Sequence, residues 1–134
     1  MLIIITGTIG IGKTTVCQKM VEALRNQGYK CSGILTYKDA TGHIIVEDIQ
    51  SGKTEILASS NSEYDGPRTP RYSFSPKGID FGIRAIDKGI DSDVLVIDEV
   101  GHLELGGEGF SKSLELIIAG KVKNSILVVR NEFR

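Results

Sequence analysis

The chain has 134 residues, which is enough for one domain with a core of ordinary size. Its formal net charge of -1 gives no electrostatic footprint for nucleic acid, so we do not expect nucleic acid as a partner. The first apolar run lacks a basic leader and is too short to cross a membrane, which predicts a cytoplasmic protein without membrane contact. Cys17 and Cys31 lack metal or CxxC spacing, so we expect two buried thiols in a reducing compartment.

The chain begins with a strand and a helix. Residues 2–6, LIIIT, form a continuous apolar run typical of a strand buried on both faces of a parallel sheet. Residues 13–27 show helical spacing, and Gly28 is the expected stop. The apolar face of this helix is expected to consist of Val16, Met20, Val21 and Leu24.

Three short strands are expected next, at residues 31–37, 44–49 and 54–59. The turns between them indicate antiparallel hairpins, so a small antiparallel insert should follow the first βαβ unit. Residues 60–76 hold all three prolines and predict a long surface loop, a common location for functional residues.

The second half of the chain returns to alternating helices and strands. We expect helices at 77–90 and 110–122, and strands at 93–99 and 125–131. The class is therefore α/β: a single three-layer α/β/α domain over residues 1–134, with a mostly parallel sheet.

The stretch GTIGIGKTT follows the first strand and matches the pattern G-x-x-x-x-G-K-[ST]. Glycines let the backbone curl so that its N–H groups point at phosphate oxygens, and the following helix adds its positive N-terminus. Lys13 would reach the β- and γ-phosphates, Thr14 would ligate Mg²⁺, and Thr15 would bond the α-phosphate. The alternative is a glycine-rich turn, which does not require that lysine and threonine. The expected nucleotide-binding residues are Gly7, Thr8, Ile9, Gly10, Ile11, Gly12, Lys13, Thr14 and Thr15.

The second motif is VLVIDE, residues 94–99, in which two acids end a buried strand. Open α/β sheets bind ligands at the carboxyl ends of their strands. Asp98 fits the acid that holds Mg²⁺, usually through water, and Glu99 is placed to polarise a water for attack on the γ-phosphate. The alternative is a pair of solvated acids that cap a strand. Together with the phosphate loop, the pair favours hydrolysis of a nucleoside triphosphate.

GTIGIGKTT and VLVIDEVGHLEL together resemble the nucleoside-triphosphatase family known from thermophiles and from the human cancer-related NTPase. The resemblance extends to GILTY (33–37) and GPRTPRYSF (66–74). It implies a RecA-like fold and slow Mg²⁺-dependent hydrolysis of ATP, GTP and other NTPs, with weak base selectivity. It assigns Lys13, Thr14, Asp98 and Glu99 the roles given above.

Some positions of the resemblance carry no assigned chemistry or depart from the family. Gly101 and Glu104 match the motif without an assigned role, and His102 stands where the family more often has Lys or Pro. Family members usually continue past the last strand with a further helix and strand, and that strand lies beside the phosphate-loop strand. We therefore expect this sequence to lack the family's final helix and strand, which would leave residues 2–6 as an unprotected apolar edge. Either the sequence is a truncated form, or a partner covers this edge, and association of two copies through it is a hypothesis.

Weaker candidates surround the two motifs. Asn131 follows the last strand and either senses the γ-phosphate or is a loop asparagine. Arg71 is the first candidate to neutralise transition-state charge, ahead of Arg68 and Arg130, although most surface arginines only solvate a face. The remaining candidates have plainer expected roles: Tyr72 and Phe74 in base stacking or core packing, His43 in a turn, and His102 beside the site.

Three functions remain open from the sequence. The first is an NTP phosphohydrolase with water as the acceptor. The second is a small-molecule kinase whose acceptor pocket would come from residues 60–76. The third is a nucleotide-dependent switch that binds a protein partner, because the near-neutral charge argues against RNA.

Overall fold

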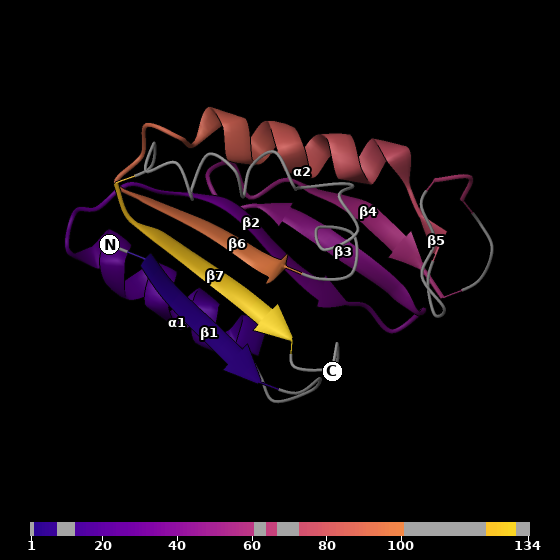
Figure 1. Cartoon of the computed structure of the whole chain (residues 1–134), viewed down its shortest axis with the longest axis horizontal. Coiled ribbons are helices and arrows are strands. Elements are labelled where there is room, and N and C mark those ends of the chain that lie inside the picture. Colours follow the sequence, from indigo (N-terminus) through magenta and orange to yellow (C-terminus); the bar gives the residue numbers. More distant parts are fainter. Residues whose placement is uncertain (1, 8–12, 61–63, 67–72, 101–122, 131–134) are drawn as a thin grey trace.

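The computed structural model describes residues 2–7, 13–60, 64–66, 73–100 and 123–130. Within these residues, seven strands form one sheet and two helices pack on it (Figure 1). The elements in chain order are β1 (Leu2–Gly7), α1 (Lys13–Asn26), β2 (Cys31–Lys38), β3 (His43–Asp48), β4 (Thr54–Ser59), β5 (Ser73–Phe74), α2 (Pro76–Lys88), β6 (Val94–Val100) and β7 (Ser125–Arg130).

The sheet is mixed. Its strand order is β1-β7-β6-β2-β3-β4-β5, and the β1–β7, β7–β6 and β6–β2 pairs are parallel. The β2–β3, β3–β4 and β4–β5 pairs are antiparallel. The expectation of a mostly parallel sheet is therefore wrong, because three of the six described strand pairs are antiparallel, whereas the expected antiparallel hairpins are confirmed. Short turns bring β3 and β4 back onto the free edge of β2, so the hairpins extend the same sheet.

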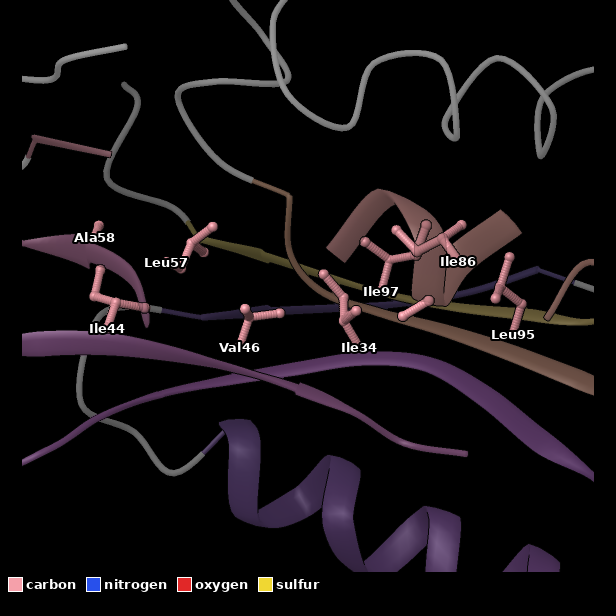
Figure 2. Close-up of a cluster of buried hydrophobic side chains, with 9 residues drawn as sticks. Ile34, Ile44, Val46, Leu57, Ala58, Ile86, Leu95 and Ile97 are labelled. Carbon is pink, nitrogen blue, oxygen red and sulfur yellow. The ribbon is translucent and has the colours of Figure 1, made fainter. Parts of the chain in front are cut away.

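The two helices lie on opposite faces of the sheet, so the described residues form three layers (Figure 1). Helix α2 packs against β2, β3 and β4, and α1 packs against β1 and β2. Figure 2 shows the cluster on the α2 face, where Ile86 of the helix meets Ile34 and Ile97 of the central strands. The cluster on the α1 face contains Cys17, Val21, Cys31, Leu35, Ile49, Val94, Val96 and Ile126.

Helix α1 agrees with the expected range and differs in its buried face. Cys17 and Val21 are buried, whereas Val16 is 46% exposed, so the assignment of Val16 to the buried face is wrong. Gly28 ends the helix at φ 92°, a conformation that glycine adopts without strain. The Tyr29 amide then donates to the Leu24 carbonyl and the Gly28 amide to the Arg25 carbonyl, which completes a Schellman cap.

Helix α2 confirms the helix expected at 77–90. Ser75 caps its start, because its hydroxyl accepts a hydrogen bond from the Gly78 amide at 3.2 Å, and Pro76 occupies the first turn. The short strand β5 lies in the segment that we expected to be loop throughout. It pairs with the end of β4, where Phe74 lies beside Ala58.

The other expected strands are present, and each of their ends lies within one residue of the expected position. The expected helix at 110–122 lies outside the described residues. Strand β1 pairs with β7 and, among the described residues, with no other strand. Ile3 is 38% exposed, so the expectation that this strand is buried on both faces is wrong. Neither described helix is long and apolar enough to cross a membrane.

Candidate functional site

The carboxyl ends of three parallel strands define the candidate site. Gly7, the last residue of β1, pairs with Arg130, the last residue of β7. Val100, the last residue of β6, pairs with Val129 of β7. Because parallel strands run in one direction, all three ends lie at the same edge of the sheet (Figure 1).

Helix α1 begins at this edge. It starts at Lys13, six residues after Gly7, and its next two residues are Thr14 and Thr15. The first amides of a helix have no partner within the helix, and together with the helix dipole they form an anion-binding end. Packing of Cys17 and Val21 on the sheet anchors the helix behind this end.

Strand β6 carries the two acids at an irregularity in its pairing with β7. Ile97 pairs with Leu127, whereas Val100 pairs with Val129, so β6 has one extra residue between these pairs. Asp98 and Glu99 occupy that interval. Such bulges re-aim side chains and are frequent beside active sites. One strand lies between β6 and β1, which places these two strands roughly 10 Å apart.

The structure thus brings Gly7, Lys13, Thr14, Asp98 and Glu99 to one end of the molecule, on the backbone positions just described. Arg130 joins them at a register position opposite Gly7, although sequence alone favoured a different arginine. Other candidates lie outside the described residues: Thr8, Ile9, Gly10, Ile11, Gly12, Arg68, Arg71, Tyr72, Gly101, His102, Glu104 and Asn131.

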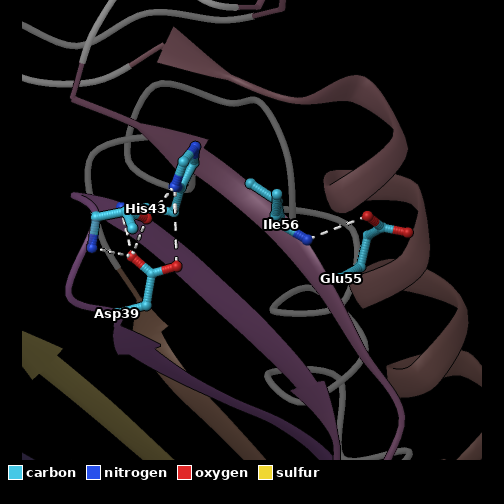
Figure 3. A network of polar contacts seen from close by, with 5 residues as sticks. Asp39, His43, Glu55 and Ile56 are labelled. Atoms are coloured by element: carbon cyan, nitrogen blue, oxygen red, sulfur yellow. Dashed lines mark hydrogen bonds and ion pairs between the residues drawn. The ribbon is translucent and has the colours of Figure 1, made fainter.

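His43 is held by its own turn at the start of β3, as expected for a turn residue (Figure 3). Its Nδ1 lies 2.6 Å from the Thr41 hydroxyl and 3.8 Å from a carboxylate oxygen of Asp39. The Thr41 hydroxyl and the His43 amide donate to Asp39 and hold the pKa of that carboxyl below its ordinary value. In the same view, the Glu55 carboxylate accepts a hydrogen bond from the Ile56 amide at 3.1 Å (Figure 3). These contacts stabilise the hairpin and suggest no catalytic role for His43.

Two further observations concern Phe74 and metal-binding clusters. Phe74 packs against the core cluster on the α2 face, which confirms the core-packing interpretation for this residue. In the part of the chain that the structure describes, no three His, Cys, Asp or Glu side chains gather into a metal-binding cluster.

The described residues form an α/β fold in which the end of β1, the start of α1 and the end of β6 lie at one edge of the sheet, and comparisons with known proteins identify the family. A family model described as NTPase matches residues 2–134. The nucleoside-triphosphatase THEP1 of Methanosarcina barkeri is 36% identical over 123 residues, which cover 87% of this chain and 69% of that protein. The protein of the same name from Pyrococcus abyssi is 33% identical, with coverage of 85% and 66%.

Solved structures show the same fold. The crystal structure of THEP1 from Aquifex aeolicus matches with a TM-score of 0.82 and 25% identity, over 98% of this chain and 77% of that one. The solution structure of a human cancer-related nucleoside triphosphatase matches with a TM-score of 0.73 and 23% identity, over 96% and 74%. The chain therefore belongs to the nucleoside-triphosphatase family. It spans about two thirds of the length of the curated relatives just named.

Proposed function

We propose that this chain is a Mg²⁺-dependent phosphohydrolase that cleaves ATP, GTP and other NTPs to NDP and phosphate with broad base tolerance. The observation that supports it is the shared sheet edge. It holds the β1 end that leads into the loop, the start of α1 and the bulged acids of β6. We also infer a RecA-like arrangement for the whole sheet, as the family resemblance implies.

In this proposal, each element of the edge has one task. The loop amides of residues 8–12 and the first turn of α1 bind the phosphates, with Lys13 on the β- and γ-phosphates and Thr15 on the α-phosphate. Thr14 and Asp98 would hold Mg²⁺, which neutralises charge on the β- and γ-phosphate oxygens when it is bound.

Glu99 orients and polarises the attacking water, and water is the acceptor of the phosphoryl group. The acid needs no partner side chain for this task, only access to a water in line with the bond that breaks. Asn131 and Arg71 are proposed to sense the γ-phosphate and to neutralise transition-state charge. Arg130 is a second candidate for the latter task, because its backbone lies opposite Gly7.

Phosphate release without an added acceptor tests the reaction class. We expect the chain to release phosphate and NDP in equal amounts from ATP, GTP, CTP and UTP, at rates within about one order of magnitude of one another. Formation of NDP only after a nucleoside or sugar acceptor is added, without release of inorganic phosphate, would instead indicate a kinase, because the phosphoryl group then goes to the acceptor. Binding of NTP without turnover in either assay would favour the switch.

We further propose that two copies of the chain associate through β1, whose outer edge has no strand partner within the described residues and whose Ile3 is 38% exposed. Light scattering over a hundredfold range of protein concentration measures this association. A rise in mass that Ile3→Lys removes supports it, whereas a monomer mass at every concentration contradicts it.

A further inference from the structure

A groove of about 420 Å³ lies at the end of the molecule opposite the phosphate-loop edge. Its lining residues come mainly from the segments where α1 and α2 end and where β2 and β6 begin. These four element ends lie together at the left side of Figure 1. The carboxyl ends of β1, β6 and β7 point away from it. The volume falls within the range of small-molecule sites, so the groove is large enough for a ligand of its own.

Three cations line this groove, and two of them have no carboxylate partner. Lys88 is engaged with Asp48 at 3.1 Å, but Arg25 and Lys30 make no ion pair within the described parts of the chain. Arg25 donates one N–H to the Ile49 carbonyl, which anchors the guanidinium and leaves its other donors available. Against these cations stands one lining acid, Asp91, so the groove favours an anion that carries few charges.

The aromatic ring of Tyr29 lines the same groove, and hydrogen bonds to α1 and to the start of β6 hold the backbone of this segment in place. Tyr29 lines the groove and is 48% exposed, and its amide is bonded to the Leu24 carbonyl at 3.1 Å. The Lys30 amide donates to Asp93 at 2.8 Å, and the Lys30 carbonyl accepts from the Val94 amide at 3.1 Å. A ring on such a rigid segment offers a stacking surface to a planar ligand at a small entropic cost.

We propose that this groove binds a nucleoside monophosphate, or another small phosphate monoester that carries a planar ring. The phosphate lies on Arg25 and Lys30, and the ring stacks on Tyr29. A triphosphate fits less well, because its additional charges would meet Asp91 and would find Lys88 already neutralised by Asp48. This site is separate from the phosphate loop and does not depend on NTP hydrolysis.

Calorimetric titration of the Lys13→Ala protein with AMP tests the site, since this variant removes the lysine of the phosphate loop. The parallel titrations use ribose 5-phosphate, which lacks the base, and adenosine, which lacks the phosphate. We expect AMP to bind, and each fragment to bind at least several-fold more weakly, because each retains only one of the two contacts. We expect Lys30→Gln in the same background to weaken AMP binding by about tenfold, the effect of one charge-assisted hydrogen bond.

Lys19→Gln is the matched control, because Lys19 is another exposed lysine, lies on α1 and does not line the groove. It should leave AMP affinity unchanged. The Lys30 side chain is exposed and makes no hydrogen bond or ion pair within the described residues, so its variant should fold, and a circular dichroism melt checks this. No AMP binding at millimolar concentration, or equal affinities for the Lys30→Gln and Lys19→Gln proteins, would overturn the proposal. Equal binding of AMP and ribose 5-phosphate would overturn the role of Tyr29.

Discussion

The ammonium of Lys88 lies 3.1 Å from the carboxylate of Asp48, and this contact joins the end of α2 to the end of β3 across 40 residues of sequence. The two partners differ in environment, because the Lys88 side chain is 61% exposed and that of Asp48 only 4%. Asp48 also accepts the Gln50 amide at 2.9 Å and the Ser51 amide at 3.4 Å. Burial raises the pKa of Asp48, but these hydrogen bonds and the Lys88 charge outweigh it and lower the pKa overall.

Asp48 should therefore contribute to acid sensitivity. A carboxyl whose pKa is lower in the folded state stabilises the fold at pH values above its ordinary pKa of 3.8. That stability is lost as the pH falls through the pKa of the folded state. We expect Asp48→Asn to lower the free energy of unfolding at pH 7 by about 1–3 kcal/mol. We also expect a weaker loss of stability between pH 5 and pH 2 than in the wild type. Urea unfolding at several pH values measures both effects.

Lys88→Gln is the control for this prediction. Because Lys88 is mostly exposed, its charge is screened, and the substitution should cost less than about 1 kcal/mol. An Asp48→Asn protein with the acid dependence of the wild type would show that Asp48 does not carry this effect.

Gly33 should be essential for the contact between β2 and β6. It pairs with Val96 at φ 108°, and a Cβ at this position would overlap the Val96 backbone. Gly33→Ala must therefore displace the part of β6 that comes before its two acids, residues 94–97. We expect a loss of at least about 2 kcal/mol, from backbone strain and from the displaced strand pairing. Urea denaturation measures the loss.

Gly52→Ala separates these two causes. Gly52 also has a positive φ, 77°, but a Cβ there would meet nothing within 4 Å. Its substitution should cost only the backbone strain, about 1–2 kcal/mol. Equal losses for the two alanine variants would contradict the overlap at Gly33.

Sequence patterns predicted most of the elements, because apolar runs such as 2–6 and 94–97 and the helical spacing of 77–90 depend on local physics. These patterns failed for features that depend on the pairing of strands that lie far apart in the sequence. Nothing local indicates that β3 would continue the parallel part of the sheet, or that β5 would pair for two residues. The exposure of Val16 depends on where α1 lies on the sheet, which spacing alone does not determine.

The site was predictable to a different extent. The two motifs follow from residue types at fixed spacing, and topology then places Gly7, Lys13, Asp98 and Glu99 at one edge of the sheet. The bulge at Asp98 and Glu99 is a feature of strand pairing and leaves no mark in the sequence. The same is true of the groove, whose cations come from α1, α2 and the segment before β2.

Removal of the metal should abolish the proposed reaction. We expect EDTA to stop phosphate release, and excess Mg²⁺ to restore it, because the β- and γ-phosphate charges are otherwise not neutralised. Asp98→Asn should raise the Mg²⁺ concentration for half-maximal rate by about tenfold, since it removes a carboxylate that would hold the ion directly or through a bound water. Asp80→Asn changes an exposed acid of α2 and should have no effect. An unchanged Mg²⁺ requirement in Asp98→Asn would contradict the metal role of Asp98.

Mg²⁺-dependent phosphate release from ATP, GTP, CTP and UTP, measured for the wild type beside Glu99→Gln, tests the central proposal most directly. Loss of a positioned base costs about 10²- to 10⁴-fold, so we predict a drop of at least a hundredfold with nucleotide affinity retained. Release by Glu99→Gln at the wild-type rate would contradict the role of Glu99. Tight binding of nucleotide by the wild type without any release would contradict the hydrolase itself.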